Sequence, residues 1–313
     1  MAAIVLVHGI AQEQYSADLL ESKWLPALAG GVRTAGFPDI ADKIWRASPG
    51  SIEARMAFYG HLFLRPGAQG LGAEELSPEQ AELAEQLSLE WLERAETRAS
   101  NEEQRRTAAT ELVYLRPDPA RQAMGIRSAV RVAWKSLARL RWFARLGNVV
   151  AERFVVRALS QVTRYLTDDA IRGEIQQIVL DKIGDDTRVL LGHSLGSIVA
   201  YEVAHRLDRP LPLLVTLGSP LGVETLVLQR LRPPASFPSR VSRWVNVADR
   251  DDLVAAEPNL TNLFAVSMPR DAIFEGSYTV DNGAEPHSAE FYLGKDHIGR
   301  PVGQVLSTTD RTP

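Results

Sequence analysis

The chain has 313 residues, long enough to bury the core of one large domain or of two ordinary ones. Hydrophobic residues make up 45% and charged residues 24%, and the formal net charge of −4 does not indicate a surface that binds nucleic acid throughout. The lack of cysteine excludes disulfides, thiolate metal sites and a cysteine nucleophile, and no His-Glu-x-x-His spacing occurs. We therefore expect no cofactor, no metal ion and no nucleic-acid partner.

The first residues are apolar but carry no basic segment, and they run directly into His8 and Gly9. This pattern predicts a buried strand and not a signal peptide. No stretch approaches the roughly 18 apolar residues that a membrane-spanning helix needs. By default we expect a cytoplasmic protein.

In chain order, the first element is the continuous apolar run Ile4–Val7, typical of a parallel strand covered on both faces. Strands and helices then alternate in two separate parts of the chain. The expected helices are residues 18–29, 171–183 and 198–207; the expected strands are 56–59, 187–191, 213–217 and 243–247. This alternation predicts an α/β fold: a mostly parallel sheet with helices on both faces, and a site along the edge where the strands end.

Residues 66–165 do not follow this alternation, because their apolar residues recur with helical spacing. A helix is expected to begin at Ser77, which is followed by proline in the first turn and by glutamine three residues on. The second half is rich in arginine and includes bulky apolar residues: Trp134, Trp142 and Phe143. We predict that residues 1–65 and 166–313 form the α/β core and that residues 66–165 form a helical cap inserted into it.

Residues 192–196 read Gly-His-Ser-Leu-Gly, directly after an apolar strand and before a helix. In this context the G-x-S-x-G pattern predicts a strained strand-to-helix turn that presents Ser194 as a nucleophile. Glycine at positions 192 and 196 is expected to remove clashes of longer side chains with the serine. The alternative interpretation is a tight turn without chemistry.

A hydroxyl that attacks an acyl carbon creates an oxyanion, which needs hydrogen-bond donors already in place. The backbone N–H of Leu195, the residue after the nucleophile, is one candidate. The N–H of Ile10, in the loop after the first strand, is the other.

A serine nucleophile also needs a base oriented by a carboxylate. His8 and His193 belong to the motifs above, His205 lies about three turns along the helix after Ser194, and His61 precedes the insertion. His287 and His297 remain, downstream of the last predicted strands. We favour His287, in a loop before an apolar segment, over His297 in a predicted surface turn.

The acid should follow the strand at residues 243–247, where Asp249, Asp251 and Asp252 lie. We favour Asp252, because the apolar pair after it would anchor the loop, and keep Asp249 as the alternative.

The HG loop, the Gly-His-Ser-Leu-Gly turn and the downstream aspartate and histidine resemble the α/β-hydrolase superfamily. Within it, the chain is similar to bacterial lipase- or esterase-like members with an HGI-type loop near the N-terminus. Those members share a W-V-N-x-x-D-x-x-D-x-V-A segment, here residues 244–255, and an H-S-A-x-x-Y-L segment, here residues 287–293. The resemblance implies Asp252 and His287 as partners of Ser194.

This resemblance covers residues 1–65 and 166–305 and leaves the insertion uncovered. It also departs from the family, because the sheet begins at residue 2 and the first strands of the usual eight-stranded sheet are absent.

The expected reaction is hydrolysis of an acyl ester through an acyl-enzyme, as in a carboxylesterase or lipase, with a small-molecule or lipid substrate. Alternatives are a thioesterase or serine peptidase, a catalytically idle binding module, or nucleic-acid binding through the arginine-rich insertion, which matches no recognised fold. The insertion could also touch an anionic membrane as a peripheral contact, although arginine stems over an apolar underside explain the same pattern.

Overall fold

The structure is a computed structural model, and it describes residues 2–46, 51–64, 76–115, 126–140, 148–223, 227–255 and 257–308. The chain divides into two compact units. The sheet unit comprises Met1–His61 and Gly173–Pro313, and the helical unit comprises Leu62–Arg172. These divisions fall a few residues from the boundaries predicted by the sequence.

The sheet unit contains a six-stranded, fully parallel sheet in the order β2-β1-β3-β4-β5-β6. Its strands are β1 (Ile4–Val7), β2 (Ala54–Ala57), β3 (Val189–His193), β4 (Leu211–Leu217), β5 (Val241–Asp249) and β6 (Ile273–Val280). The α/β class predicted from the alternation of strands and helices is therefore confirmed.

Alternating side chains of the strands face opposite layers of helices. Ile4 and Leu6 of β1 join one core, together with Leu20 and Trp24 of α1. Val5 and Val7 are also fully buried and lie on the other face of the strand. Burial of both faces explains why the central strands read as continuous apolar runs.

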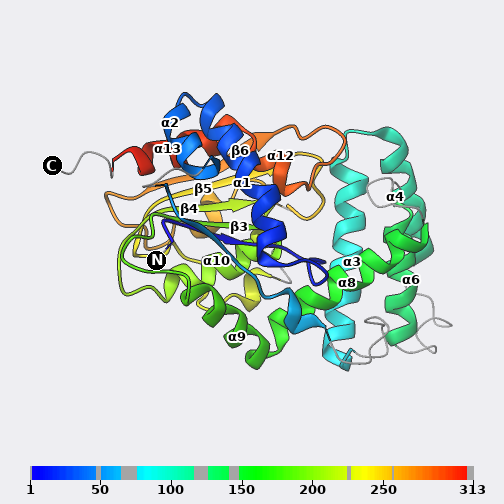
Figure 1. Cartoon of the computed structure of the whole chain (residues 1–313). Helices are drawn as coiled ribbons and strands as arrows, with labels where there is room; N and C mark the ends of the chain where they lie inside the picture. Colours follow the sequence, from blue (N-terminus) through cyan, green and yellow to red (C-terminus); the bar gives the residue numbers. More distant parts are fainter. Residues whose placement is uncertain are drawn as a thin grey trace. The chain divides into compact units, whose positions relative to one another are not determined.

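Helices α1, α12 and α13 lie on one side of the sheet and α10 on the other (Figure 1). The helices of this unit are α1 (Ala17–Thr34), α2 (Pro38–Trp45), α10 (Leu195–His205), α11 (Thr261–Phe264), α12 (Ala289–Leu293) and α13 (Asp296–Ser307). Short 3-10 helices are η1 (Gly60–Phe63), η3 (Pro220–Gly222) and η4 (Leu228–Arg230). Helix α9 (Asp169–Leu180) contains the division between the units.

Helices α2, α11, α12 and α13 and strand β6 were not predicted. Strand β6 is one of the two edge strands, and its only buried residue is Gly276, so it lacks the apolar pattern of the central strands. Helix α13 contains His297, which the sequence analysis placed in a surface turn. Its buried residues include Gly299, Pro301 and Gly303, residue types that disfavour a helix when local propensity alone is considered.

The helical unit is built from four described helices: α3 (Pro78–Arg98), α4 (Glu102–Leu115), α6 (Ile126–Ala138) and α8 (Asn148–Thr167). The predicted start at Ser77 is confirmed as a capping box, in which the Ser77 hydroxyl accepts from Gln80 N–H and the Gln80 side chain accepts from Ser77 N–H. Helix α3 packs against the other three. Trp134 is buried, whereas Trp142 and Phe143 lie outside the described residues.

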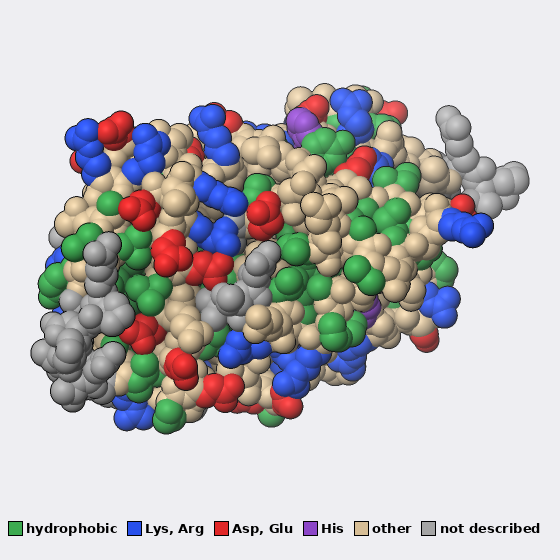
Figure 2. Space-filling view, turned by 180° about the vertical axis from the view of Figure 1, so that it is seen from behind, with side chains coloured by type: hydrophobic (Ala, Val, Ile, Leu, Met, Phe, Trp, Pro, Cys, Tyr) green, Lys and Arg blue, Asp and Glu red, His purple; other side chains and the backbone are tan. Residues whose placement is uncertain are grey.

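Several arginines of the helical unit are engaged within that unit. Arg139 pairs with the buried Glu111 at 2.8 Å, and Arg127 donates to the carbonyl of Leu76. On the face shown in Figure 2, basic and acidic side chains are interspersed. Among the described residues, no helix combines the length and the apolar character needed to cross a membrane.

Candidate active site

The site lies at the point where the order of strands along the sheet reverses. From β1 the chain moves to the edge strand β2, and then returns to the other side of β1 to form β3 and the remaining strands. In parallel sheets, the loops at the carboxyl ends of the two strands that flank such a reversal diverge and leave a crevice for ligands. Here these loops carry His8 to Ile10 after β1 and Ser194 after β3, and the paired residues Val7 and Gly192 bring them side by side.

Ser194 occupies a strained backbone conformation between β3 and α10. Its φ of 56° and ψ of −128° fall in a region that costs a non-glycine residue about 1–3 kcal/mol. The serine is 1% exposed, and its N–H donates to the carbonyl of Leu217 at the end of β4. A strained serine at a strand-to-helix turn agrees with the turn predicted by the G-x-S-x-G pattern.

The two glycines of this turn are needed for a reason other than the predicted one. A side chain at Gly192 would meet the backbone of Gly196, and a side chain at Gly196 would meet the carbonyls of Val7 and His8. Neither would first meet Ser194. The glycines therefore permit β3, α10 and β1 to cross closely, and the serine is placed by that crossing.

The two predicted oxyanion donors belong to segments that adjoin the serine. Leu195 is the first residue of α10, so its N–H has no carbonyl one turn earlier in the helix to accept it. Gly9 packs against the serine, since a Cβ at Gly9 would lie 2.6 Å from Ser194 Cβ and 3.2 Å from Ser194 Oγ. Within the described chain, the Ile10 N–H has no hydrogen-bond acceptor.

The orientation of the Gly9–Ile10 peptide is fixed by His8. The His8 imidazole donates from Nδ1 to the Gly9 carbonyl at 2.7 Å, and its Nε2 accepts from the Tyr59 N–H at 3.1 Å. Because a trans peptide is planar, the Ile10 N–H points away from the carbonyl that faces His8. Burial lowers the pKa of His8 to about 4, and a proton on Nε2 would face the Tyr59 N–H.

His287 and Asp252 form a hydrogen-bonded pair at the same edge of the sheet. The Nδ1 of His287 donates to Asp252 Oδ2 at 2.8 Å, and the aspartate side chain is fully buried. The other oxygen, Oδ1, accepts from the N–H groups of Val254 and Ala255 at 3.0 and 3.5 Å. The aspartate that the sequence analysis favoured is therefore the one that contacts His287.

Asp249, the alternative acid, has a different set of partners. Its carboxylate accepts from the N–H groups of Asp251 and Asn282, and burial raises its pKa. The Asn282 side chain then donates to the carbonyl of Pro286 at 3.0 Å. Asp249 therefore ties the end of β5 to the loop that precedes His287.

His193, the residue before Ser194 in the G-x-S-x-G pattern, supports the same loop. Its Nε2 donates to the backbone carbonyl of His287 at 3.0 Å, and the two rings are 4.5 Å apart. Burial, with a smaller contribution from the nearby His287, holds the pKa of His193 well below its usual value. His193 is thus a neutral side chain that links the nucleophile turn to His287.

The structure brings the predicted residues to one edge of the sheet but does not join all of them by hydrogen bonds. Ser194 Oγ is buried and makes no hydrogen bond with any described residue. Catalytic hydrogen bonds are often long in unliganded enzymes. The rejected histidines His61 and His297 are exposed, and His205 ends α10.

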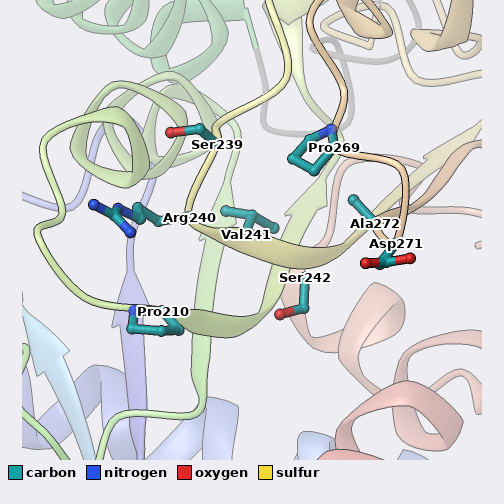
Figure 3. Close-up of a pocket in the computed structure, with 8 residues that line it drawn as sticks. All are labelled: Pro210, Ser239, Arg240, Val241, Ser242, Pro269, Asp271 and Ala272. Atoms are coloured by element: carbon teal, nitrogen blue, oxygen red, sulfur yellow. The ribbon is translucent and has the colours of Figure 1, made fainter.

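A pocket of about 220 Å³ lies at the other end of the strands, at the amino ends of β4 and β5. In Figure 3 the Arg240 guanidinium and the Asp271 carboxylate lie on opposite sides of it. Its lining residues are Pro210, Ser239, Arg240, Val241, Ser242, Pro269, Asp271 and Ala272. The pocket therefore lies about one strand length, roughly 20 Å, from Ser194.

No protein-family model, no curated protein and no solved structure matches this chain. Within the described residues, no cluster of three or more histidine and acidic side chains could hold a metal ion. The geometry of the site is therefore the basis for assigning a function.

Proposed function

We propose that this protein is a serine hydrolase of the α/β-hydrolase type that cleaves acyl esters. The observation that carries the proposal is the strained, buried Ser194 at the reversal point of a parallel sheet. The same ends of the strands carry His287, hydrogen-bonded to the fully buried carboxylate of Asp252. A non-glycine residue held at positive φ is an indicator of function when the surrounding structure enforces it. The α/β-hydrolase fold usually has eight strands, and the six parallel strands of this sheet correspond to that fold without its first two strands.

In the proposed reaction, Ser194 Oγ attacks the acyl carbon while His287 takes the hydroxyl proton. Asp252 holds the imidazole by its Nδ1 and stabilises the imidazolium that forms. The carbonyl oxygen becomes an oxyanion between the N–H groups of Ile10 and Leu195.

The imidazolium then protonates the leaving alkoxide as the carbon–oxygen bond breaks, which leaves Ser194 acylated. A water molecule attacks the acyl-enzyme and gives a proton to His287. The serine departs with that proton, which releases the carboxylic acid and restores the enzyme.

The nucleophile is tested by labelling with a small fluorophosphonate and by hydrolysis of p-nitrophenyl esters of increasing chain length. Ser194→Ala should lose labelling and leave only the roughly 10³–10⁴-fold rate over water that binding and the oxyanion donors supply. Ser219→Ala is the matched control, because Ser219 is another buried serine at the same sheet edge whose hydroxyl accepts from Leu221 N–H.

Retention of labelling and turnover by a folded Ser194→Ala protein would reject the proposal. Absence of labelling in the wild-type protein would favour an idle binding module. The chain-length profile, with a thioester and an amide of the same acyl group beside it, identifies the leaving group.

A further inference from the structure

Tyr292, on the short helix α12 that follows His287, has a hydroxyl group placed against the acid of the site. The hydroxyl donates to Asp252 Oδ2 at 2.8 Å, which is the same oxygen that accepts from His287 Nδ1. It also accepts from the backbone N–H of Asp249 at 2.6 Å. Its ring is fully buried, so neither hydrogen bond competes with water.

We propose that Tyr292 is a positioning residue, whose hydroxyl shares Asp252 Oδ2 with His287 and thereby sets how strongly Asp252 stabilises the protonated imidazole. This proposal rests on the proposed function, because it assigns Tyr292 a role in the same Ser194–His287–Asp252 site. Tyr292 acts through Asp252 and does not itself touch the reacting atoms.

The direction of the effect follows from the hydrogen bonds on the carboxylate. Asp252 Oδ1 stays anchored to the N–H groups of Val254 and Ala255 when the Tyr292 hydroxyl is removed. The carboxylate therefore keeps its place, while Oδ2 loses one of its two donors. A carboxylate oxygen that accepts fewer hydrogen bonds keeps more of its negative charge. Oδ2 then interacts more strongly with its remaining donor, so the imidazolium of His287 becomes more stable.

The other titratable groups near His287 come from β3, from the end of β5 with the loop after it, and from α12. His193, at the end of β3, has its pKa held well below the usual value by burial, so it is neutral around neutral pH. Asp249 and Asp252 come from the end of β5, and Tyr292 comes from α12. Burial and the charge of Asp252 raise the pKa of Tyr292 well above its usual value, so its hydroxyl keeps its proton.

The experiment measures the rate of Ser194 phosphonylation by a small fluorophosphonate as a function of pH, in the wild type and in Tyr292→Phe. The acid limb of this profile reports protonation of the base in the free enzyme. We expect the acid limb in Tyr292→Phe to move to higher pH, equivalent to roughly three- to tenfold tighter binding of the proton, with a matching loss of rate at pH values on that limb.

The matched control is Tyr201→Phe. Tyr201 is also buried, and its hydroxyl accepts from a backbone N–H, that of Ser236 at 3.0 Å, while it donates to the Ser236 carbonyl. Both variants therefore leave one backbone N–H without its acceptor, and both should lose a similar amount of stability. Only Tyr292→Phe should move the acid limb.

An acid limb in Tyr292→Phe that is unchanged, or that moves to lower pH, would overturn the proposal. So would an equal shift in Tyr201→Phe, since this would show a general effect of lost stability. If the wild-type protein shows no phosphonylation that depends on Ser194, the proposed function itself fails. The Tyr292 proposal alone fails if the wild type is active and Tyr292→Phe has the same acid limb.

Discussion

Acidification should destabilise this protein through His8, the residue that orients the Gly9–Ile10 peptide. An unfolded histidine has a pKa near 6.5, whereas burial lowers the pKa of folded His8 to about 4. Between these values the unfolded chain binds more protons, so stability is fully present above pH 6.5 and falls as the pH decreases toward 4. At about 1.4 kcal/mol per pKa unit, the full loss is about 3 kcal/mol, and most of it occurs by pH 4.5.

The assay is urea unfolding of the wild type and His8→Asn at a series of pH values from 7.5 to 4.5. At neutral pH the variant should be the less stable protein, because the Tyr59 N–H loses its acceptor. As the pH falls, the difference should narrow by about 2–3 kcal/mol, because asparagine does not titrate. Contributions from carboxylates are common to both proteins and cancel.

Thr187→Val serves as the control, because it also removes the acceptor of a backbone N–H, that of Gly184, without removing a titratable group. The pH dependence of its stability should follow that of the wild type. A stability difference between wild type and His8→Asn that stays constant from pH 7.5 to pH 4.5 would refute the reasoning. It would mean that His8 accepts a proton in the folded state without cost.

Two further predictions concern the predicted oxyanion loop and the two aspartates. Gly9→Ala places a Cβ 2.6 Å from Ser194 Cβ and should lower kcat about 10²-fold with an unchanged circular dichroism spectrum, whereas Gly30→Ala, with open space around it, should keep full activity. Asp252→Asn should lower kcat about 10⁴-fold, because the amide favours the wrong imidazole tautomer. Asp249→Asn should mainly lower the melting temperature, with kcat within about tenfold of wild type. Equal losses of kcat in Asp252→Asn and Asp249→Asn would contradict the inference that Asp252 orients His287 while Asp249 only supports the loop before it.

The parts of the site that the sequence could predict are local turns. Within residues 192–196, a side chain at Gly192 would meet the backbone of Gly196, so part of the strand-to-helix turn follows from neighbouring residues, whereas Gly196 faces the carbonyls of Val7 and His8 in a distant segment. The apolar run Ile4–Val7 and the capping box at Ser77 are also local patterns. The alternation of such segments was sufficient to predict a parallel α/β sheet.

Contacts between distant segments required the tertiary structure. Asp249 is the last residue of β5 and Asp252 lies in the loop after it, and the sequence favours Asp252 without excluding Asp249. The choice is made by His287, 35 residues later, and by Tyr292, 40 residues later. Their positions depend on the path of the edge strand β6, whose pairing with β5 shifts register between Val245 and Val247.

Tyr292 illustrates why local patterns were insufficient. The resemblance included it in the segment at residues 287–293, but no spacing shows that its hydroxyl reaches the carboxylate of Asp252. Sequence patterns report which face of an element is buried, because burial repeats with the period of the helix or strand. They do not report which buried polar groups meet, since that depends on the packing of α12 beside the loop after β5, and this packing is what assembled the histidine–aspartate–tyrosine group.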